Sequence, residues 1–246
     1  MQQSNGYIII FTVITTIIIG GALSFTSQVL GPAQKRSIEL DTKSQILKAV
    51  MEIKEGDDVL GIYDQRIKSL VVDYNGNEIT TNAKGAPIVA EEVNILKNYK
   101  KSAEDREYPV FMFMSESNPD EVESYILPIY GAGLWDKIWG FVALDKSLQS
   151  IQGVVFDHKG ETPGLGARIS DKEVQDRFKN KKIYDQGGSL VSVSMLKGEK
   201  GEPLGDHHVD GLSGATLTAK GVNDMLLRYL GSYQAYFKKI NPDLVK

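Results

Sequence analysis

The segment best equipped for chemistry is residues 210–218, which read Asp-Gly-Leu-Ser-Gly-Ala-Thr-Leu-Thr. Its small residues would let the backbone approach a ligand closely. The hydroxyls of Thr216 and Thr218 stand where an apolar pattern of helical spacing begins. Backbone N–H groups at a helix N-terminus lack partners and attract anions, so the spacing predicts a phosphate site. An ordinary loop closed by a helix cap at Thr218 has the same pattern, and the residues alone leave both interpretations open.

Two further segments combine glycine with apolar residues: residues 131–135 (Gly-Ala-Gly-Leu-Trp) and residues 161–166 (Glu-Thr-Pro-Gly-Leu-Gly). Pro163 followed by Gly164 is typical of a type II turn. The glycines on either side of Leu165 would leave backbone amides open beside an apolar side chain. Taken alone, the segment is equally compatible with a plain connection between strands.

The run Asp210-x-x-Ser213-Gly214-Ala215-Thr216 resembles the flavinylation motif of FMN-binding domains in bacterial respiratory complexes. The resemblance implies that Thr216 carries a covalent FMN through a phosphoester. It further implies that the three residues before Thr216 contact the cofactor. Asp210 would be recognised during maturation by a flavin transferase, which uses FAD as donor and a divalent cation.

The two glycine-containing segments precede this motif in the order that the family has them. With an N-terminal anchor in front, the chain is similar to the NqrC family, a membrane-anchored FMN subunit of the sodium-translocating NADH:quinone oxidoreductase. The resemblance implies a second group of cofactor-binding residues around the flavin ring: Leu134, Glu161, Thr162, Leu165 and Gly166. Glu161 would then affect the redox potential of the ring.

The implied function is that of an electron-carrying subunit, not catalytic alone. Its complex would oxidise NADH, reduce ubiquinone or another quinone, and pump sodium ions, and the other subunits would be its partners. No Gly-x-Gly-x-x-Gly follows a predicted strand, so NADH would be oxidised elsewhere in the complex. The FMN subunit of the ferredoxin:NAD oxidoreductase (Rnf-type) complex shares the motif and is one alternative. A cofactor-free membrane-anchored scaffold is another, whereas a hydrolase using Ser213 lacks the Gly-x-Ser-x-Gly elbow.

Composition excludes several other functions. The 246 residues carry a net charge of −4, with lysine and arginine spread along the chain, which does not favour a nucleic-acid partner. Cysteine is absent, so disulfides, thiolate metal sites and thiol nucleophiles are excluded. His207 and His208 are adjacent, and neighbouring side chains rarely converge on one ion, so no metal site is predicted.

The N-terminal segment predicts a single transmembrane helix. No charged residue precedes Lys35, and the apolar stretch 7–25 approaches the roughly 20 residues that span a bilayer. Residues 22–24 (Ala-Leu-Ser) have the form of a signal-peptide cleavage site, but the start of the chain lacks the Lys or Arg of a signal peptide. We therefore expect a retained anchor.

The orientation of this anchor is predicted differently by charge and by resemblance. Lys35 and Arg36 follow the helix, and the positive-inside rule would place that side in the cytoplasm. The resemblance implies the opposite orientation, with the folded domain on the periplasmic side of the bacterial inner membrane. We adopt the topology of the family.

The rest of the chain predicts an α+β domain, because strands group ahead of helices without regular alternation. Asp41 or Ser44 is expected to cap a helix carrying Ile46, Leu47, Val50 and Met51 on one face. Runs rich in β-branched and aromatic residues predict strands at 70–72, 110–114, 125–130, 138–144, 154–156 and 190–195.

Turn and helix signals complete this interpretation. Asn75-Gly76 predicts a chain reversal before Ile79, and Ser170 with Glu173 predicts a capping box. A long helix from about Thr218 would bury one apolar face: Val222, Met225, Leu226, Tyr229, Leu230, Tyr233 and Phe237. The expected organisation is an N-terminal tail and transmembrane helix at 1–27, a stalk helix with the first part of the soluble domain at 28–128, and an FMN-binding domain at 129–240.

Individual side chains carry weaker predictions. Trp135 and Trp139 are expected in the core, since buried indoles are mostly packing residues. Lys220 is in reach of a phosphate on the motif, or else exposed to solvent. His158 is either close to the ring or an ordinary loop residue.

Overall fold

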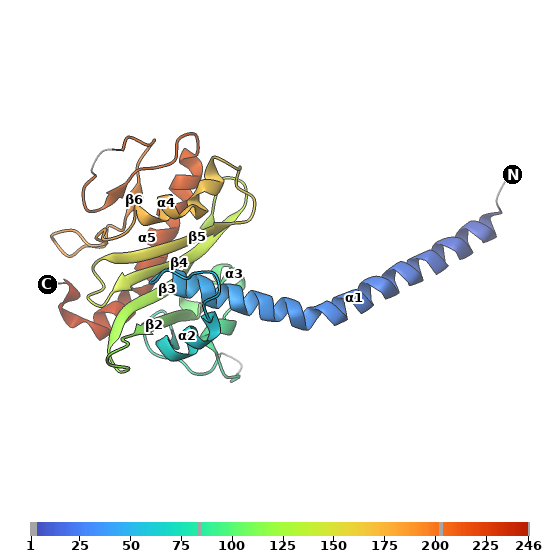
Figure 1. Ribbon diagram of the computed structural model, residues 1–246, viewed down its shortest axis with the longest axis horizontal. Coiled ribbons are helices and arrows are strands. Elements are labelled where there is room, and N and C mark those ends of the chain that lie inside the picture. Colours follow the sequence, from blue (N-terminus) through green and yellow to red (C-terminus); the bar gives the residue numbers. More distant parts are fainter. Residues whose placement is uncertain (1–3, 83–84, 202–203, 246) are drawn as a thin grey trace. The chain divides into compact units, whose positions relative to one another are not determined.

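The computed structural model describes residues 4–82, 85–201 and 204–245. The chain forms two compact units, one ending at Lys43 and one running from Ser44 onward. Figure 1 labels the main helices and strands. In chain order the elements are α1 (Asn5–Lys48), α2 (Val59–Arg66), β1 (Ile67–Val72), the 3₁₀ turn Ala90–Glu92, α3 (Ile95–Tyr99), the 3₁₀ turn Ala103–Asp105, β2 (Tyr108–Met114), β3 (Val122–Ala132), β4 (Lys137–Asp145), β5 (Ile151–His158), the 3₁₀ turn Gly166–Ser170, α4 (Lys172–Asp176), β6 (Ser194–Met195), β7 (His208–Val209), α5 (Thr216–Ile240) and the 3₁₀ turn Pro242–Val245.

Helix α1 contains the predicted membrane-spanning segment. In the part of the chain that the structure describes, it is the one helix long and apolar enough to cross a membrane. The expected separate helix capped by Asp41 or Ser44 is wrong, because α1 continues through both residues to Lys48. Its last residues still do what the pattern predicted: Ile46 and Leu47 are fully buried in the second unit.

The second unit is built on one five-stranded antiparallel sheet of order β1-β2-β3-β4-β5. Each strand therefore pairs with its neighbour in sequence, as a meander. Strands β3 and β4 form the longest pairing, which runs from Ser124 opposite Asp145 to Ala132 opposite Lys137. The β3–β4 hairpin consequently ends at residues 133–136, inside the first glycine-containing segment.

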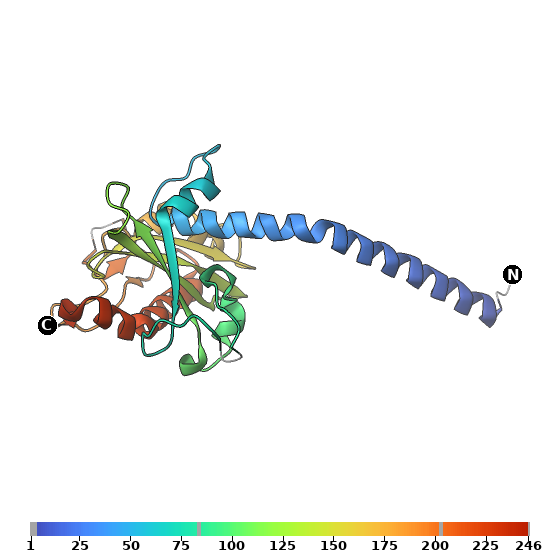
Figure 2. The ribbon, with the colours of Figure 1, turned by 90° about the horizontal axis from the view of Figure 1, so that it is seen from below.

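Both faces of this sheet are buried. Along β2, Val110 packs in one apolar cluster while Phe111 and Phe113 pack in the other, as the two-residue period of a strand requires. The larger cluster includes α5, and the smaller one includes the end of α1 and Tyr63 of α2. Figure 2 shows α5 and the end of α1 on opposite sides of the sheet.

Helix α5 covers the larger cluster with the face that the sequence predicted. The seven apolar residues expected on that face, from Val222 to Phe237, are all buried. The helix can approach the sheet closely because Gly221 faces the carbonyl oxygen of Ala132, where a side chain would overlap the backbone. This close contact brings the N-terminus of α5 near the β3–β4 hairpin.

Several other local predictions are tested by the structure. The reversal at Asn75-Gly76 is confirmed, with Gly76 at φ +72° and the Ile79 N–H bonded to the Val71 carbonyl at 2.9 Å. The strand expected at 190–195 is confirmed only for β6. The capping box is wrong: Ser170 ends a 3₁₀ turn, and Asp171 stands at the N-cap of α4 without a side-chain cap bond.

Candidate functional site

The three motif segments meet at the carboxylate of Glu161. Its Oε1 accepts the Trp135 backbone N–H at 2.9 Å, and its Oε2 accepts the Thr218 hydroxyl at 2.5 Å. Glu161 is 3% exposed. One buried carboxylate thus joins the tip of the β3–β4 hairpin, the segment after β5 and the first turn of α5.

Hydrogen bonding keeps Glu161 ionised. Burial raises the pKa of this carboxyl, but the bonds from Thr218 and from the backbone at Trp135, Asp136 and Leu134 lower it by more, so its pKa lies below the ordinary value. Both oxygens are therefore acceptors at neutral pH. Glu161 acts as a structural connection within the site.

Glycine is required where these segments cross. A methyl group on Gly166 would lie 2.5 Å from the Thr218 Oγ1 atom and 2.6 Å from the Glu161 Oε2 atom, so it would push apart the bond between them. The predicted turn is confirmed as well. Gly164 has φ +74°, and the Leu165 N–H donates to the Thr162 carbonyl at 3.1 Å.

Apolar side chains stand exposed around this junction. Leu134 is 45% exposed and Leu165 is 41% exposed, although both belong to turns that are fixed by the buried Glu161 segment. Leu165 also lies against the motif, because a methyl group placed on Gly214 would be 3.0 Å from its Cδ2 atom. Large apolar side chains left open beside a polar loop are typical of a ligand site.

The motif forms the N-terminus of α5, which begins at Thr216 and is therefore two residues longer than predicted. Ala215 occupies the N-cap and has no polar side chain to cap the helix. The expected cap by Thr218 is wrong, because its hydroxyl is buried and bonds Glu161. Thr216, Ser213 and Gly214 are exposed. Backbone N–H groups at this end are thus available to an anion.

Asp210 lies in a separate contact before the motif. Its carboxylate accepts the backbone N–H groups of Lys200 at 3.1 Å and Gly201 at 2.8 Å. These bonds lower the pKa of Asp210 below its ordinary value. Asp210 therefore stabilises the loop, as the sequence predicted for the finished protein.

Three other side chains singled out in the sequence lie near the motif. The prediction that Trp135 is a core residue is wrong: it is 70% exposed, and its indole N–H donates to the Thr162 hydroxyl at 3.1 Å. Trp139 is partly buried against the larger cluster. Lys220 pairs with Asp224 on the exposed side of α5.

His158 lies beside the Glu161 segment. Its Nδ1 atom is 3.3 Å from the Glu161 backbone N–H, which donates to it. The side chain therefore helps to fix the chain direction between β5 and the Glu161 turn.

The sequence did not indicate the charged cluster behind Asp210. The carboxylate of Glu199 binds Arg168 and Arg177, at 2.8 and 2.7 Å from its Oε1 atom. Hydrogen bonds from these two guanidinium groups lower the pKa of Glu199 to about 2. The partners are more than 20 residues apart, so no local spacing could have predicted the pairing.

Comparison with known proteins decides between the interpretations of this site. The profile of the FMN-binding domain matches residues 133–231, which include all three segments. The NqrC subunit of the Na(+)-translocating NADH-quinone reductase from Pseudomonas aeruginosa is 31% identical, over 94% of this chain and 93% of its own length. Its counterpart from Chlamydia muridarum is 30% identical over 96% and 93%. The chain belongs to the NqrC family.

Solved members of this family have the same fold. The crystal structure of the NqrC subunit from Parabacteroides distasonis superimposes with a TM-score of 0.71 at 32% identity, covering 85% of this chain and 96% of that one. The NqrC structure from Shewanella oneidensis gives 0.69 at 25% identity, covering 83% and 98%. The predicted resemblance and the α+β fold behind one apolar helix are thus confirmed. An FMN-binding domain argues against the cofactor-free scaffold.

Proposed function

We propose that this chain is the electron-carrying NqrC subunit of a complex that oxidises NADH, reduces ubiquinone or another quinone, and pumps sodium ions. Its cofactor is FMN, joined through its phosphate to the Thr216 hydroxyl. The observation that carries the proposal is the position of Thr216: it is exposed and is the first residue of a helix whose N-cap, Ala215, has no polar side chain. Family membership supports the same conclusion.

The phosphate end of the cofactor fits the start of α5. An ester at Thr216 would place the phosphate beside N–H groups that lack intrahelical acceptors, where the helix dipole favours negative charge. Ser213 and Gly214 are exposed on the same loop. A covalent ester also prevents loss of the cofactor to a dilute exterior.

The ring end fits the apolar side chains around the junction. Leu134 and Leu165 offer apolar contacts, while Thr162 and Gly166 supply backbone groups from the adjoining turn. Bound FMN supplies one- and two-electron transfer, and the protein orients and tunes it. Glu161 keeps both apolar residues in place by tying their loops together, and its negative charge opposes further negative charge nearby.

The proposal predicts an electron-transfer result. In the anaerobic membrane complex that contains this chain, NADH is expected to reduce the covalently bound flavin, and added quinone to reoxidise it. The measurement is the flavin absorbance, with the covalent flavin of this chain identified afterwards by in-gel fluorescence. A covalent flavin that stays oxidised in a complex actively transferring electrons from NADH to quinone would contradict the proposal.

The folded unit is proposed to lie on the periplasmic side of the inner membrane, with α1 as a single membrane pass. The natural absence of cysteine makes a direct test possible. Glu104, an exposed residue in the 3₁₀ turn Ala103–Asp105, is changed to cysteine and treated with a membrane-impermeant maleimide. Labelling is expected in intact spheroplasts and not in sealed inside-out vesicles. The reverse pattern would place the domain in the cytoplasm, as the charges at Lys35 and Arg36 predict.

A further inference from the structure

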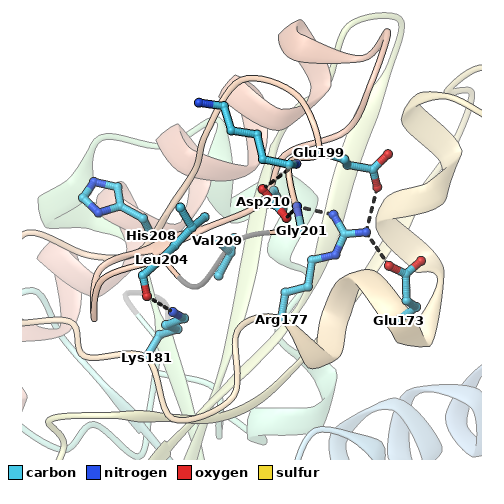
Figure 3. A pocket seen from close by; sticks show the side chains of 10 residues that line it. Glu173, Arg177, Lys181, Glu199, Gly201, Leu204, His208, Val209 and Asp210 are labelled. Atoms are coloured by element: carbon cyan, nitrogen blue, oxygen red, sulfur yellow. Dashed lines mark hydrogen bonds and ion pairs between the residues drawn. The ribbon is translucent and has the colours of Figure 1, made fainter.

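A polar cavity of about 560 Å³ lies behind the flavinylation motif. Figure 3 shows Arg177 reaching across it from the end of α4 towards Glu199 and Asp210. The Arg177 side chain is 16% exposed. It is therefore part of the wall of the cavity and largely removed from solvent.

Arg177 uses both ends of its guanidinium group. Nη1 donates to the backbone carbonyls of Gly211 at 2.8 Å and Asp210 at 3.3 Å, and Nη2 donates to the carboxylates of Glu173 and Glu199. A planar guanidinium suits such a set because its donors are fixed in one plane. Arg177 thus connects α4, the segment at Glu199 and the beginning of the motif.

These contacts determine where the Asp210 carboxylate stands. Arg177 holds the Asp210 carbonyl directly and, through Glu199, holds the segment whose next two N–H groups bind the Asp210 carboxylate. The backbone leaves little freedom here, since a methyl group on Gly211 would overlap the Leu196 carbonyl. Loss of Arg177 would release both supports of Asp210 together.

We propose that Arg177 is a positioning residue for attachment of FMN: it holds Asp210 in the orientation that the flavin transferase recognises. The inference rests on the proposed function, because it concerns how Thr216 acquires its cofactor. It assigns Arg177 no contact with the mature flavin. Its effect therefore appears in the rate of maturation.

Arg168 provides a matched control. It binds the same carboxylate, with Nη1 and Nη2 donating to Glu199 at 2.9 and 2.8 Å, but within the described residues its guanidinium group donates to carboxylates and not to the motif backbone. Removing either arginine takes a cation from Glu199. Only removal of Arg177 also takes the donor from the Asp210 and Gly211 carbonyls.

The experiment uses the full chain, purified in detergent from cells without a flavin transferase. It is incubated with purified transferase, FAD and Mg²⁺, and FMN incorporation is followed by in-gel fluorescence and intact mass. Arg177→Gln and Arg177→Lys are expected to lower the rate at saturating chain by about tenfold, since a hydrogen bond from a charged donor is worth a factor of that order. Arg168→Gln is expected to stay within about twofold, as for a surface ion pair.

Two readouts separate positioning from simple loss of fold. A smaller folded fraction raises only the apparent KM, whereas a misplaced Asp210 lowers the saturating rate. Arg177→Lys keeps a cation beside Glu173 and Glu199 and so preserves the fold if Arg177→Gln does not. In addition, Arg177→Lys is expected to slow the Asp210→Asn chain no further, because both changes act through one carboxylate.

The outcomes distinguish this inference from the function on which it rests. If the wild-type chain acquires no FMN, the proposed function fails and the inference with it. If the wild-type chain is flavinylated and Arg177→Lys matches its saturating rate, only the inference is overturned. Equal slowing by Arg168→Gln, or slowing that multiplies with Asp210→Asn, also overturns it.

Discussion

The Thr216→Val chain is expected to carry no covalent flavin, even when it is produced with an active flavin transferase. Valine has nearly the shape of threonine but no hydroxyl, so the phosphoester cannot form. Thr216 is exposed at the first position of α5, and the substitution should leave the fold intact. Intact mass and in-gel fluorescence of the denatured chain measure the loss, and NADH:quinone electron transfer by the assembled complex should be lost with it.

Two neighbouring hydroxyls are the controls for this prediction. Ser213→Ala and Thr218→Val remove hydroxyls from the same loop and the same helical turn. Both chains are expected to retain the FMN-sized mass. Fluorescence that persists in Thr216→Val and disappears in either control would show that the attachment residue was misassigned.

Glu161→Gln is expected to loosen the junction of the three segments and to change the flavin. The amide cannot accept from both the Trp135 N–H and the Thr218 hydroxyl as an ionised carboxylate does. Leaving a buried donor unpaired costs about 1–3 kcal/mol of unfolding free energy. Removing a negative charge near the ring should also make its midpoint potential more positive, which a redox titration of the flavinylated chain would measure.

Thr218→Val tests whether the carboxylate and the hydroxyl act together. The loss in the double variant Glu161→Gln/Thr218→Val is expected to be smaller than the sum of the single losses, with a coupling of about 0.5–3 kcal/mol. Strict additivity in unfolding measurements would mean that this hydrogen bond contributes nothing.

The contribution of Glu161 should depend on pH in one direction. The folded-state pKa of Glu161 is below its unfolded value of about 4.3, so its stabilising effect is present above that pH and lost as the pH falls. The difference in Tm between wild type and Glu161→Gln should therefore be full at pH 7 and shrink at acid pH. A difference that grows below pH 4 would contradict this assignment.

Regular elements were predictable where a local pattern agreed with the final packing. The runs in β2 to β5 are long enough to be recognised, and the apolar face of α5 repeats at helical spacing through 25 residues. Caps were less predictable because they depend on competing partners. Asp41 lies inside the continuous α1, and the Thr218 hydroxyl bonds a carboxylate 57 residues away instead of capping its own helix.

The motif residues of the site were predictable, but the connections between them were not. Resemblance indicated Glu161 and Thr216 without showing that Glu161 is buried and joins two other segments. Trp135 was expected in the core because of its size, yet its position at a hairpin tip leaves it exposed. Arg177 carries no sequence signal, since its partners are brought together only by the fold.

The most direct test of a flavin on Thr216 is fragmentation mass spectrometry of the tryptic peptide 201–220, from the full chain matured by a flavin transferase. Trypsin cuts after Lys200 and Lys220, and the peptide contains three hydroxyl side chains, Ser213, Thr216 and Thr218. We predict an FMN phosphoester on Thr216. An unmodified peptide, or FMN located on Ser213 or Thr218, would contradict the account.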